Sequence, residues 1–312
     1  MVDFVKFKKP KDEEDLDIPK KRGRNNFSFK RIFLWLLIFF IISSVISSIS
    51  LALSPKIAVI PISGVIMTDS SSGSLLSSDT TSSREISESL YNIVSDSSVK
   101  GVILDINSPG GSPVASEEIS KAIEFVRENG IPVYATIGDV GASGAFWVAM
   151  SADKVYSSRM STIGSIGVTS AGLSFEDLIR EYNITYRKQT AGEFKDMGSP
   201  YRKQTEVEEE KVQKILNEIH SAFINQIADS RNLSYSHVET DSTGEIFLGT
   251  YGQLRGYIDE IGNYRDALTD MKNEVGNSSL VIDYGPKPGL FDGIGILSSL
   301  PNFDSKSQIL LR

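Results

Sequence analysis

Between residue 56 and about residue 190, short apolar runs alternate with longer amphipathic segments. The apolar runs end in turn signals such as Pro-Gly pairs, which is typical of buried strands. The segments between them carry apolar residues at helical spacing. Strands that alternate with helices predict parallel β-α units, with the helices packed on the sheet. The alternation therefore predicts an α/β fold.

The expected elements follow from this pattern, with further helices after residue 190. The expected strands are 56–66, 99–107, 131–138, 154–158, 163–170 and 184–189. The expected helices are 84–96, 114–130, a run that opens at Ser143, 175–183, a long charged helix at 203–231, and 264–275. A Ser/Thr-rich stretch at 67–83 shows no packing signal, and we expect it to be flexible.

Residues 32–53 form a stretch of 22 residues without a charge. A helix of this length spans about 33 Å, which is enough to cross a bilayer core of about 30 Å. A cleaved signal peptide is the alternative, but its apolar region usually has about 7–15 residues. Here a long charged arm also precedes the stretch. We therefore expect an uncleaved transmembrane helix.

The arm at residues 1–31 contains ten Lys/Arg and six Asp/Glu. It has little apolar surface to bury, so we expect it to be disordered. Positive charge before the helix predicts a cytoplasmic N-terminus. Residues 54–285 then form an extracytoplasmic domain, followed by a weakly patterned tail at 286–312. The formal net charge of −8 argues against a general nucleic-acid partner.

The chain has no cysteine and two histidines, His220 and His237. This excludes disulfides, thiolate metal sites, a cysteine nucleophile and a histidine-rich metal cluster. We interpret both histidines as ordinary surface or helix-side residues. A serine nucleophile in this chain would then need a base other than histidine.

Ser143 lies in "GASGAFWVAM", after an expected strand and at the start of an expected helix. There its hydroxyl meets the positive end of the helix dipole, and the N–H of Gly144 can stabilise an oxyanion. The alternative is a helix-capping serine. In "DINSPGGS", residues 105–112, Gly110 and Gly111 can direct backbone N–H groups at a substrate oxygen. The alternative there is a plain turn before a helix.

A lysine can serve as the base when burial disfavours its charged form. An ordinary lysine pKa of about 10.4 has to fall toward neutrality for this role. Lys195 stands out because "AGEFKDMGSP" surrounds it with glycines and with Phe194 and Met197, which can keep water away. The adjacent Asp196 opposes the role unless its side chain points elsewhere.

Five motifs resemble those of signal peptide peptidase A, a family of membrane-anchored serine proteases, and occur in the same order. They are "DINSPGGS", "GASGAFWVAM", "STIGSIGV", "GEFKDMGSP" and "GEIFLGTYGQLRGYIDEIG". The resemblance covers roughly residues 56–275 and is to the short, single-repeat form. It implies that Ser143 is the nucleophile and Lys195 the general base. This chain has Ala145 where the family often has a second glycine, a small change that leaves the role of Ser143 in place.

The same resemblance implies supporting roles for other residues. Ser165 would help to orient the lysine ammonium, and Gly110 or Gly111 would form the oxyanion hole with the N–H of Gly144. The implied fold is the crotonase/Clp-protease spiral of β-β-α units. Members of the family form homo-oligomeric rings, and in the short form serine and lysine come from different protomers. The helix at 203–231 can serve as an assembly surface.

The implied substrates are peptides with small or apolar side chains, such as cleaved signal peptides, and no metal or other cofactor is required. Three alternatives remain. One is a crotonase-fold acyl-CoA enzyme, to which Ser143, Ser165 and Lys195 would be superfluous. Another is an inactive scaffold, and the third is a related membrane protease that acts on membrane regulators.

Overall fold

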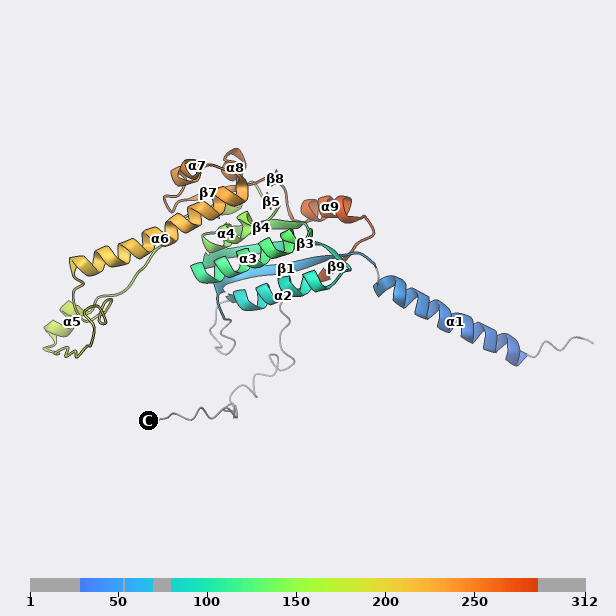
Figure 1. The fold of residues 1–312 in the computed structure, drawn as a ribbon, viewed down its shortest axis with the longest axis horizontal. Helices are drawn as coiled ribbons and strands as arrows, with labels where there is room; N and C mark the ends of the chain where they lie inside the picture. Colours follow the sequence, from blue (N-terminus) through green and yellow to red (C-terminus); the bar gives the residue numbers. More distant parts are fainter. Residues whose placement is uncertain (1–28, 53, 70–79, 286–312) are drawn as a thin grey trace, which may run out of the picture. The chain divides into compact units, whose positions relative to one another are not determined.

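The computed structural model describes residues 29–52, 54–69 and 80–285 (Figure 1). The expected tail at 286–312 and most of the expected arm at 1–31 lie outside the described residues.

The chain separates into two units, residues 1–52 and residues 53–312. In the first unit, α1 (Phe29–Ala52) is a helix of 24 residues. Where the chain is described, no helix combines the length and hydropathy that a membrane crossing requires. The anchor expected at 32–53 therefore stays a prediction.

The second unit is built on a predominantly parallel sheet, which confirms the α/β class. The main path of the sheet runs β2 (Thr80–Ser82), β1 (Lys56–Met67), β3 (Val99–Gly111), β4 (Val133–Ala142), β5 (Lys154–Ser157) and β8 (Glu260–Ile261). Beside this path, β9 (Leu280–Asp283) pairs with β1, and β6 (Thr162–Gly164) pairs with β4 and with β7 (Ile246–Leu248). Within the described ranges, the β6–β7 pair alone is antiparallel.

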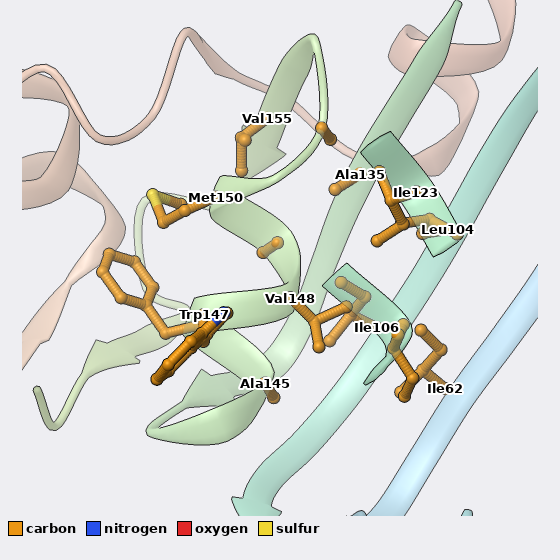
Figure 2. Packing of buried hydrophobic residues seen from close by; sticks show 14 of the residues in the cluster. Ile62, Leu104, Ile106, Ile123, Ala135, Ala145, Trp147, Val148, Met150 and Val155 are labelled. Atoms are coloured by element: carbon orange, nitrogen blue, oxygen red, sulfur yellow. The ribbon is translucent and has the colours of Figure 1, made fainter. Parts of the chain in front are cut away.

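Helices cover both faces of this sheet. The larger core lies under α2 (Ser83–Ser95), α3 (Pro113–Glu128), α4 (Gly144–Met150) and the second half of α6 (Glu206–Arg231). Figure 2 shows α4 and α3 side chains meeting those of β1, β3 and β4 in this core. On the other face, α9 (Tyr264–Val275) packs through Ala267 and Met271. The shorter helices are α5 (Glu176–Glu181), α7 (Tyr235–Thr240) and α8 (Gly249–Leu254).

The expected strand at 184–189 is wrong, because these residues have no regular secondary structure. They belong to the segment 168–205, which extends away from the sheet with α5 (Figure 1). Among the residues that the structure describes, no strand pairs with them. Part of the stretch expected to be flexible forms β2, which pairs with the end of β1.

Candidate active site

Ser143 occupies a sharp turn between β4 and α4. Its backbone has φ 52° and ψ −124°, which is uncommon for a residue with a side chain. The turn is fixed on one side, because Ser143 N donates to Gly164 O at 2.8 Å. The Ser143 side chain makes no capping hydrogen bond to α4. The helix-cap alternative is therefore wrong, and the hydroxyl is available for another purpose.

Position 110 has room for glycine but not for a larger residue, because the Ser143 turn approaches its backbone closely. Its φ is +96°, and a Cβ there would lie 2.6 Å from Gly144 N and 2.7 Å from Ala142 O. The plain-turn alternative is also wrong, since β3 continues through both glycines and pairs Gly110 with Val65 of β1. The end of β3 and the Ser143 turn therefore lie directly against each other.

Two backbone amides meet beside Ser143. Ser112 N donates to Ile66 O at 2.8 Å, so the preceding amide, that of Gly111, points to the opposite side of the strand, toward the Ser143 turn. A Cβ built on Gly144 would lie 3.3 Å from Gly111 N. Gly110 N, in contrast, already donates to Ser108 Oγ at 3.1 Å. Of the two glycines, Gly111 thus has the amide that suits an oxyanion hole.

A cavity of about 460 Å³ opens at this turn. Its walls include Gly111, Ser143, Gly144, Trp147, Ser165 and His220. Four of the six predicted site residues therefore meet at one cavity, and a fifth, Gly110, packs against the turn from behind. Ser165 also has a positive φ of 53°, and its N–H donates to Glu245 O at 2.7 Å, which fixes it beside the turn, directly after the Gly164 oxygen that accepts from Ser143 N.

Lys195 is the predicted residue that the fold does not bring to the cavity of its own chain. It lies in the loop before α6, and that loop is tied to Glu208 near the start of the helix. Phe223, which stacks on Trp147 with ring centroids 5.0 Å apart, lies 15 residues further along, or about 22 Å. The expectation that neighbouring apolar residues shield the lysine is wrong for the single chain, because Lys195 is exposed.

Sequence reasoning missed His220 as a member of this cavity. Its Nε2, like Nε1 of Trp147, is buried without a hydrogen-bond partner among the described residues. A usable signal was its position three residues before Phe223, which places both on one face of α6. No hydrogen bond joins His220 to Ser143 in the described part of the chain. The other histidine, His237, contacts Arg255 O at 2.9 Å through Nε2.

Comparison with known proteins identifies similar peptidases. The family model described as Peptidase family S49 matches residues 126–278. A protein of Enterococcus faecium named signal peptide peptidase SppA is 32% identical over 234 residues, which cover 75% of this chain and 68% of that protein. Protease 4 of Haemophilus influenzae is 29% identical, over 78% of this chain and 39% of its own length.

Among solved structures, a mutant of ClpP1 from Listeria monocytogenes aligns with a TM-score of 0.44 and 19% identity, covering 67% of this chain and 94% of that chain. The match to the Enterococcus relative extends over most of both proteins, and the family model spans the segment that holds the serine turn. The chain therefore belongs to the signal peptide peptidase A family, peptidase family S49, and is a serine peptidase.

Proposed function

We propose that this chain is a membrane-anchored endopeptidase that uses a Ser143–Lys195 couple to cleave signal peptides or other small apolar peptides outside the cytoplasm. The observation that carries the proposal is the uncapped hydroxyl of Ser143, held at a turn that opens on the cavity. Backbone amides of Gly111 and Gly144 lie beside it. This is the arrangement that acyl transfer requires: a nucleophile next to donors for the oxyanion.

The proposed reaction has two stages. The neutral amine of Lys195 accepts the Ser143 Oγ proton while the oxygen attacks a peptide carbonyl, and the amides of Gly111 and Gly144 donate to the oxyanion. The protonated lysine then donates to the leaving amine. In the second stage the same lysine activates a water, which hydrolyses the acyl-enzyme and restores the serine. Ser165, which lines the same cavity beside Ser143, orients the amine. This chemistry requires no metal or other cofactor.

The lysine in each site would come from a neighbouring copy of the chain. The segment 168–205, which carries Lys195, exposes large apolar side chains to an unusual degree. Among them are Leu173 at 75%, Tyr182 at 69% and Ile184 at 60%. Such a surface favours burial against another protein. A second copy, docking this segment near the cavity, would complete the site, and repetition of this contact would build a Clp-type ring.

The walls of the cavity support the proposed substrate class. Trp147 and Phe223 form a stacked aromatic wall, and Leu216 and Val168 add apolar surface. A cavity of this kind favours apolar side chains on an extended peptide.

With the uncharged segment 32–53 as an anchor, the site would face the space where cleaved signal peptides remain in the bilayer. Alkaline extraction of membranes tests the anchor: release of the full chain into the supernatant would contradict it.

The substrate proposal predicts a clear ranking of peptides. The full chain in detergent micelles should cleave a peptide of small and apolar residues at least about tenfold more efficiently than the same peptide with a central Lys or Asp, because an unpaired charge is costly in an apolar cavity. Mass spectrometry of the products measures this ratio. Equal rates for both peptides would contradict the proposal. Faster cleavage of an intact membrane protein than of free peptides would favour a regulator as the substrate.

A histidine-based mechanism makes a different prediction from the one proposed here. His220→Asn should lower kcat/KM by less than about tenfold, because His220 then serves only as cavity wall, whereas loss of a general base costs about 10²–10⁴. The comparison is made at one pH on the same apolar peptide, with assembly size measured by light scattering. Loss of activity equal to that of Ser143→Ala, in a normally assembled variant, would identify His220 as the base.

A further inference from the structure

Lys195 is followed directly by an aspartate. A carboxylate beside an amine favours the protonated, charged form of the amine, whereas a base has to be neutral. The order Lys195–Asp196 is therefore unfavourable for the proposed mechanism unless the aspartate charge is directed elsewhere. The structure shows where it is directed.

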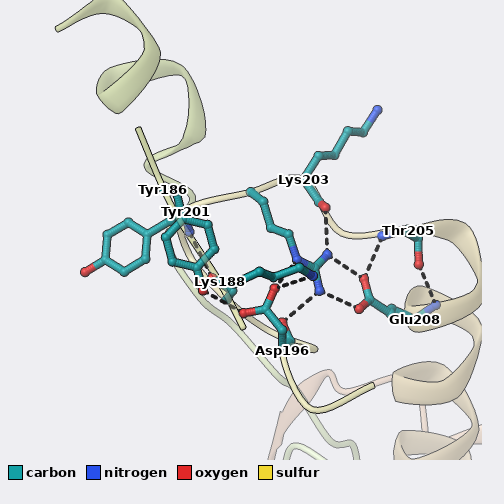
Figure 3. Close-up of polar contacts among 9 residues, drawn as sticks. Tyr186, Lys188, Asp196, Tyr201, Lys203, Thr205 and Glu208 are labelled. Atoms are coloured by element: carbon teal, nitrogen blue, oxygen red, sulfur yellow. Dashed lines mark hydrogen bonds and ion pairs between the residues drawn. The ribbon is translucent and has the colours of Figure 1, made fainter. Parts of the chain in front are cut away.

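The side chain of Asp196 is turned into a network of donors and is only 8% exposed. Tyr186 Oη donates to it at 2.7 Å, Lys188 Nζ donates at 2.9 Å, and Arg202 Nε donates to the same oxygen as the lysine. A further Arg202 nitrogen, Nη2, donates to the backbone oxygen of Asp196 at 2.8 Å. Arg202 thus holds both the carboxylate and the backbone of the residue after Lys195. Figure 3 shows the network of polar contacts around Asp196 and Glu208.

Arg202 is itself fixed to the start of α6. Its Nη1 and Nη2 donate to the two carboxylate oxygens of Glu208, at 2.9 and 2.6 Å. Glu208 is only 5% exposed at its side chain and accepts from Thr205 N at 2.9 Å, as part of the box that caps the helix. A planar guanidinium is suited to this double contact, and an ammonium is not. We call Asp196, Arg202 and Glu208 the clamp.

The charges in and around the clamp balance. Two carboxylates, Asp196 and Glu208, face two cations, Arg202 and Lys188. The Arg202 hydrogen bonds hold the pKa of Asp196 well below its ordinary value and lower that of Glu208 to about 2. A lowered pKa means that each carboxylate is charged at any pH above about 4, so the clamp does not titrate where the enzyme is expected to work.

Other charged groups near the loop leave this balance intact. From α6, Lys211 places its ammonium over the ring of Phe194, the residue that precedes Lys195, 4.4 Å from the centroid. Arg202 Nη1 donates to the backbone oxygen of Lys203 at 3.0 Å, and the Lys203 side chain extends away from the clamp (Figure 3). Glu193 is an exposed acid on the same loop. Asp196 is the carboxylate directly adjacent to Lys195 in the chain, and its charge is compensated within the clamp by Arg202.

We propose that Arg202 is a positioning residue that withdraws the Asp196 carboxylate from Lys195 and fixes the lysine-bearing loop to α6, so that Lys195 can act as a neutral base. This inference rests on the proposed role of Lys195. Arg202 then affects the protonation of Lys195 through Asp196 and does not itself contact substrate.

The test is the pH dependence of kcat/KM for the full chain and for Arg202→Gln. In the variant, Asp196 loses the Arg202 bonds to its carboxylate and backbone and keeps Tyr186 and Lys188, so the carboxylate is held less firmly away from Lys195. An opposite charge within about 4–6 Å of an amine raises the pKa of that amine by about one to three units. The acid limb of the profile should therefore move to higher pH by about one unit or more, with about a tenfold loss of kcat/KM on that limb. Arg202→Lys should lie between the variant and the wild type.

The matched control is the double variant Asp196→Asn, Arg202→Gln. Removal of the uncompensated carboxylate should return the acid limb to its wild-type position, which a merely structural role of Arg202 does not predict. An unmoved limb in Arg202→Gln, or a limb that stays displaced in the double variant, would overturn the inference. If Arg202→Gln fails to assemble, Arg202→Lys takes its place, because an ammonium does not reproduce the double contact to Asp196 and Glu208 and the limb should move in the same direction by a smaller amount; no movement there would also overturn the inference.

Failure of the inference differs from failure of the proposed function. If Lys195→Ala retains activity, the base has been assigned wrongly, and the inference fails with it. If Lys195→Ala is inactive but the acid limb does not respond to Arg202→Gln, the base stands and the clamp alone is refuted.

Discussion

Ser143→Ala should abolish peptide hydrolysis while leaving the fold and assembly of the protein unchanged. The hydroxyl makes no capping hydrogen bond and faces the cavity, so its loss removes the nucleophile and little else. Loss of a catalytic serine typically costs about 10⁶ in kcat, with a residual 10³–10⁴ over water left by the remaining groups. The measurement is cleavage of an apolar peptide by the full chain in detergent, beside a thermal melt and light scattering.

The matched control for this variant is Ser165→Ala. Ser165 also has a positive φ and lines the same cavity, so the two substitutions impose similar structural changes. An orienting role predicts a partial loss of about 10- to 100-fold, since general-base catalysis is weakened rather than removed. Hydrolysis retained by Ser143→Ala at more than a few per cent, or an equal loss in both variants, would contradict the nucleophile assignment.

Lys195→Ala should also be inactive, and a mixture of the two inactive variants should regain activity. The loop that carries the lysine is tied to Glu208, and Glu208 lies about 22 Å along α6 from Phe223, which contacts Trp147, so the two groups are expected to meet across an interface. In a randomly mixed 1:1 ring, half of the sites have an intact serine, and half of those receive an intact lysine. Co-expressed Ser143→Ala and Lys195→Ala chains should therefore reach about a quarter of wild-type activity.

Two controls define this experiment. Each variant expressed alone should remain inactive. A mixture of either single variant with the double variant Ser143→Ala, Lys195→Ala should remain inactive as well. Activity that stays absent at every mixing ratio, in rings of normal size, would show that each chain must supply both groups itself. Full activity in Lys195→Arg would contradict the base role in a different way, because a guanidinium stays charged at any working pH.

The long helices could be predicted from the sequence because their signals are local. The expected helix at 264–275 coincides with α9, and a capping box with Asn263 marks its start. The expected helix at 203–231 corresponds to α6, which has apolar residues at regular spacing and a capping box of its own. In α9 the spacing and the cap specify the same start, whereas α6 begins at Glu206, three residues later than expected, where Thr205 caps it.

The short strands could not be predicted in the same way. β2 has three residues and β9 has four, too few to show a period, and each exists because β1 offers it an edge. Residues 184–189 show the opposite case: their composition is strand-like, but no strand in the described part of the chain pairs with them, and their backbone is irregular. Strand formation at such lengths depends on a partner from elsewhere in the chain, which a local pattern does not contain.

The site shows the same division. The turn at Ser143 is a local strand–turn–helix feature, and its position was accessible from the sequence. His220 enters the cavity because α6 crosses onto α4, where Phe223 stacks on Trp147, and this contact joins residues far apart in the chain. The direction of Asp196 depends on Arg202 and on the capped end of α6. Adjacency in sequence suggested a conflict with Lys195 that the fold resolves.

The most direct test of the central claim is covalent labelling of the full chain with a fluorophosphonate, with the modified residue located by mass spectrometry. A fluorophosphonate reacts with a serine that is activated by a base and placed beside an oxyanion hole. We expect a label on Ser143 of the assembled protein and none in Ser143→Ala. A label on another residue, or no label in a folded and assembled sample, would contradict it.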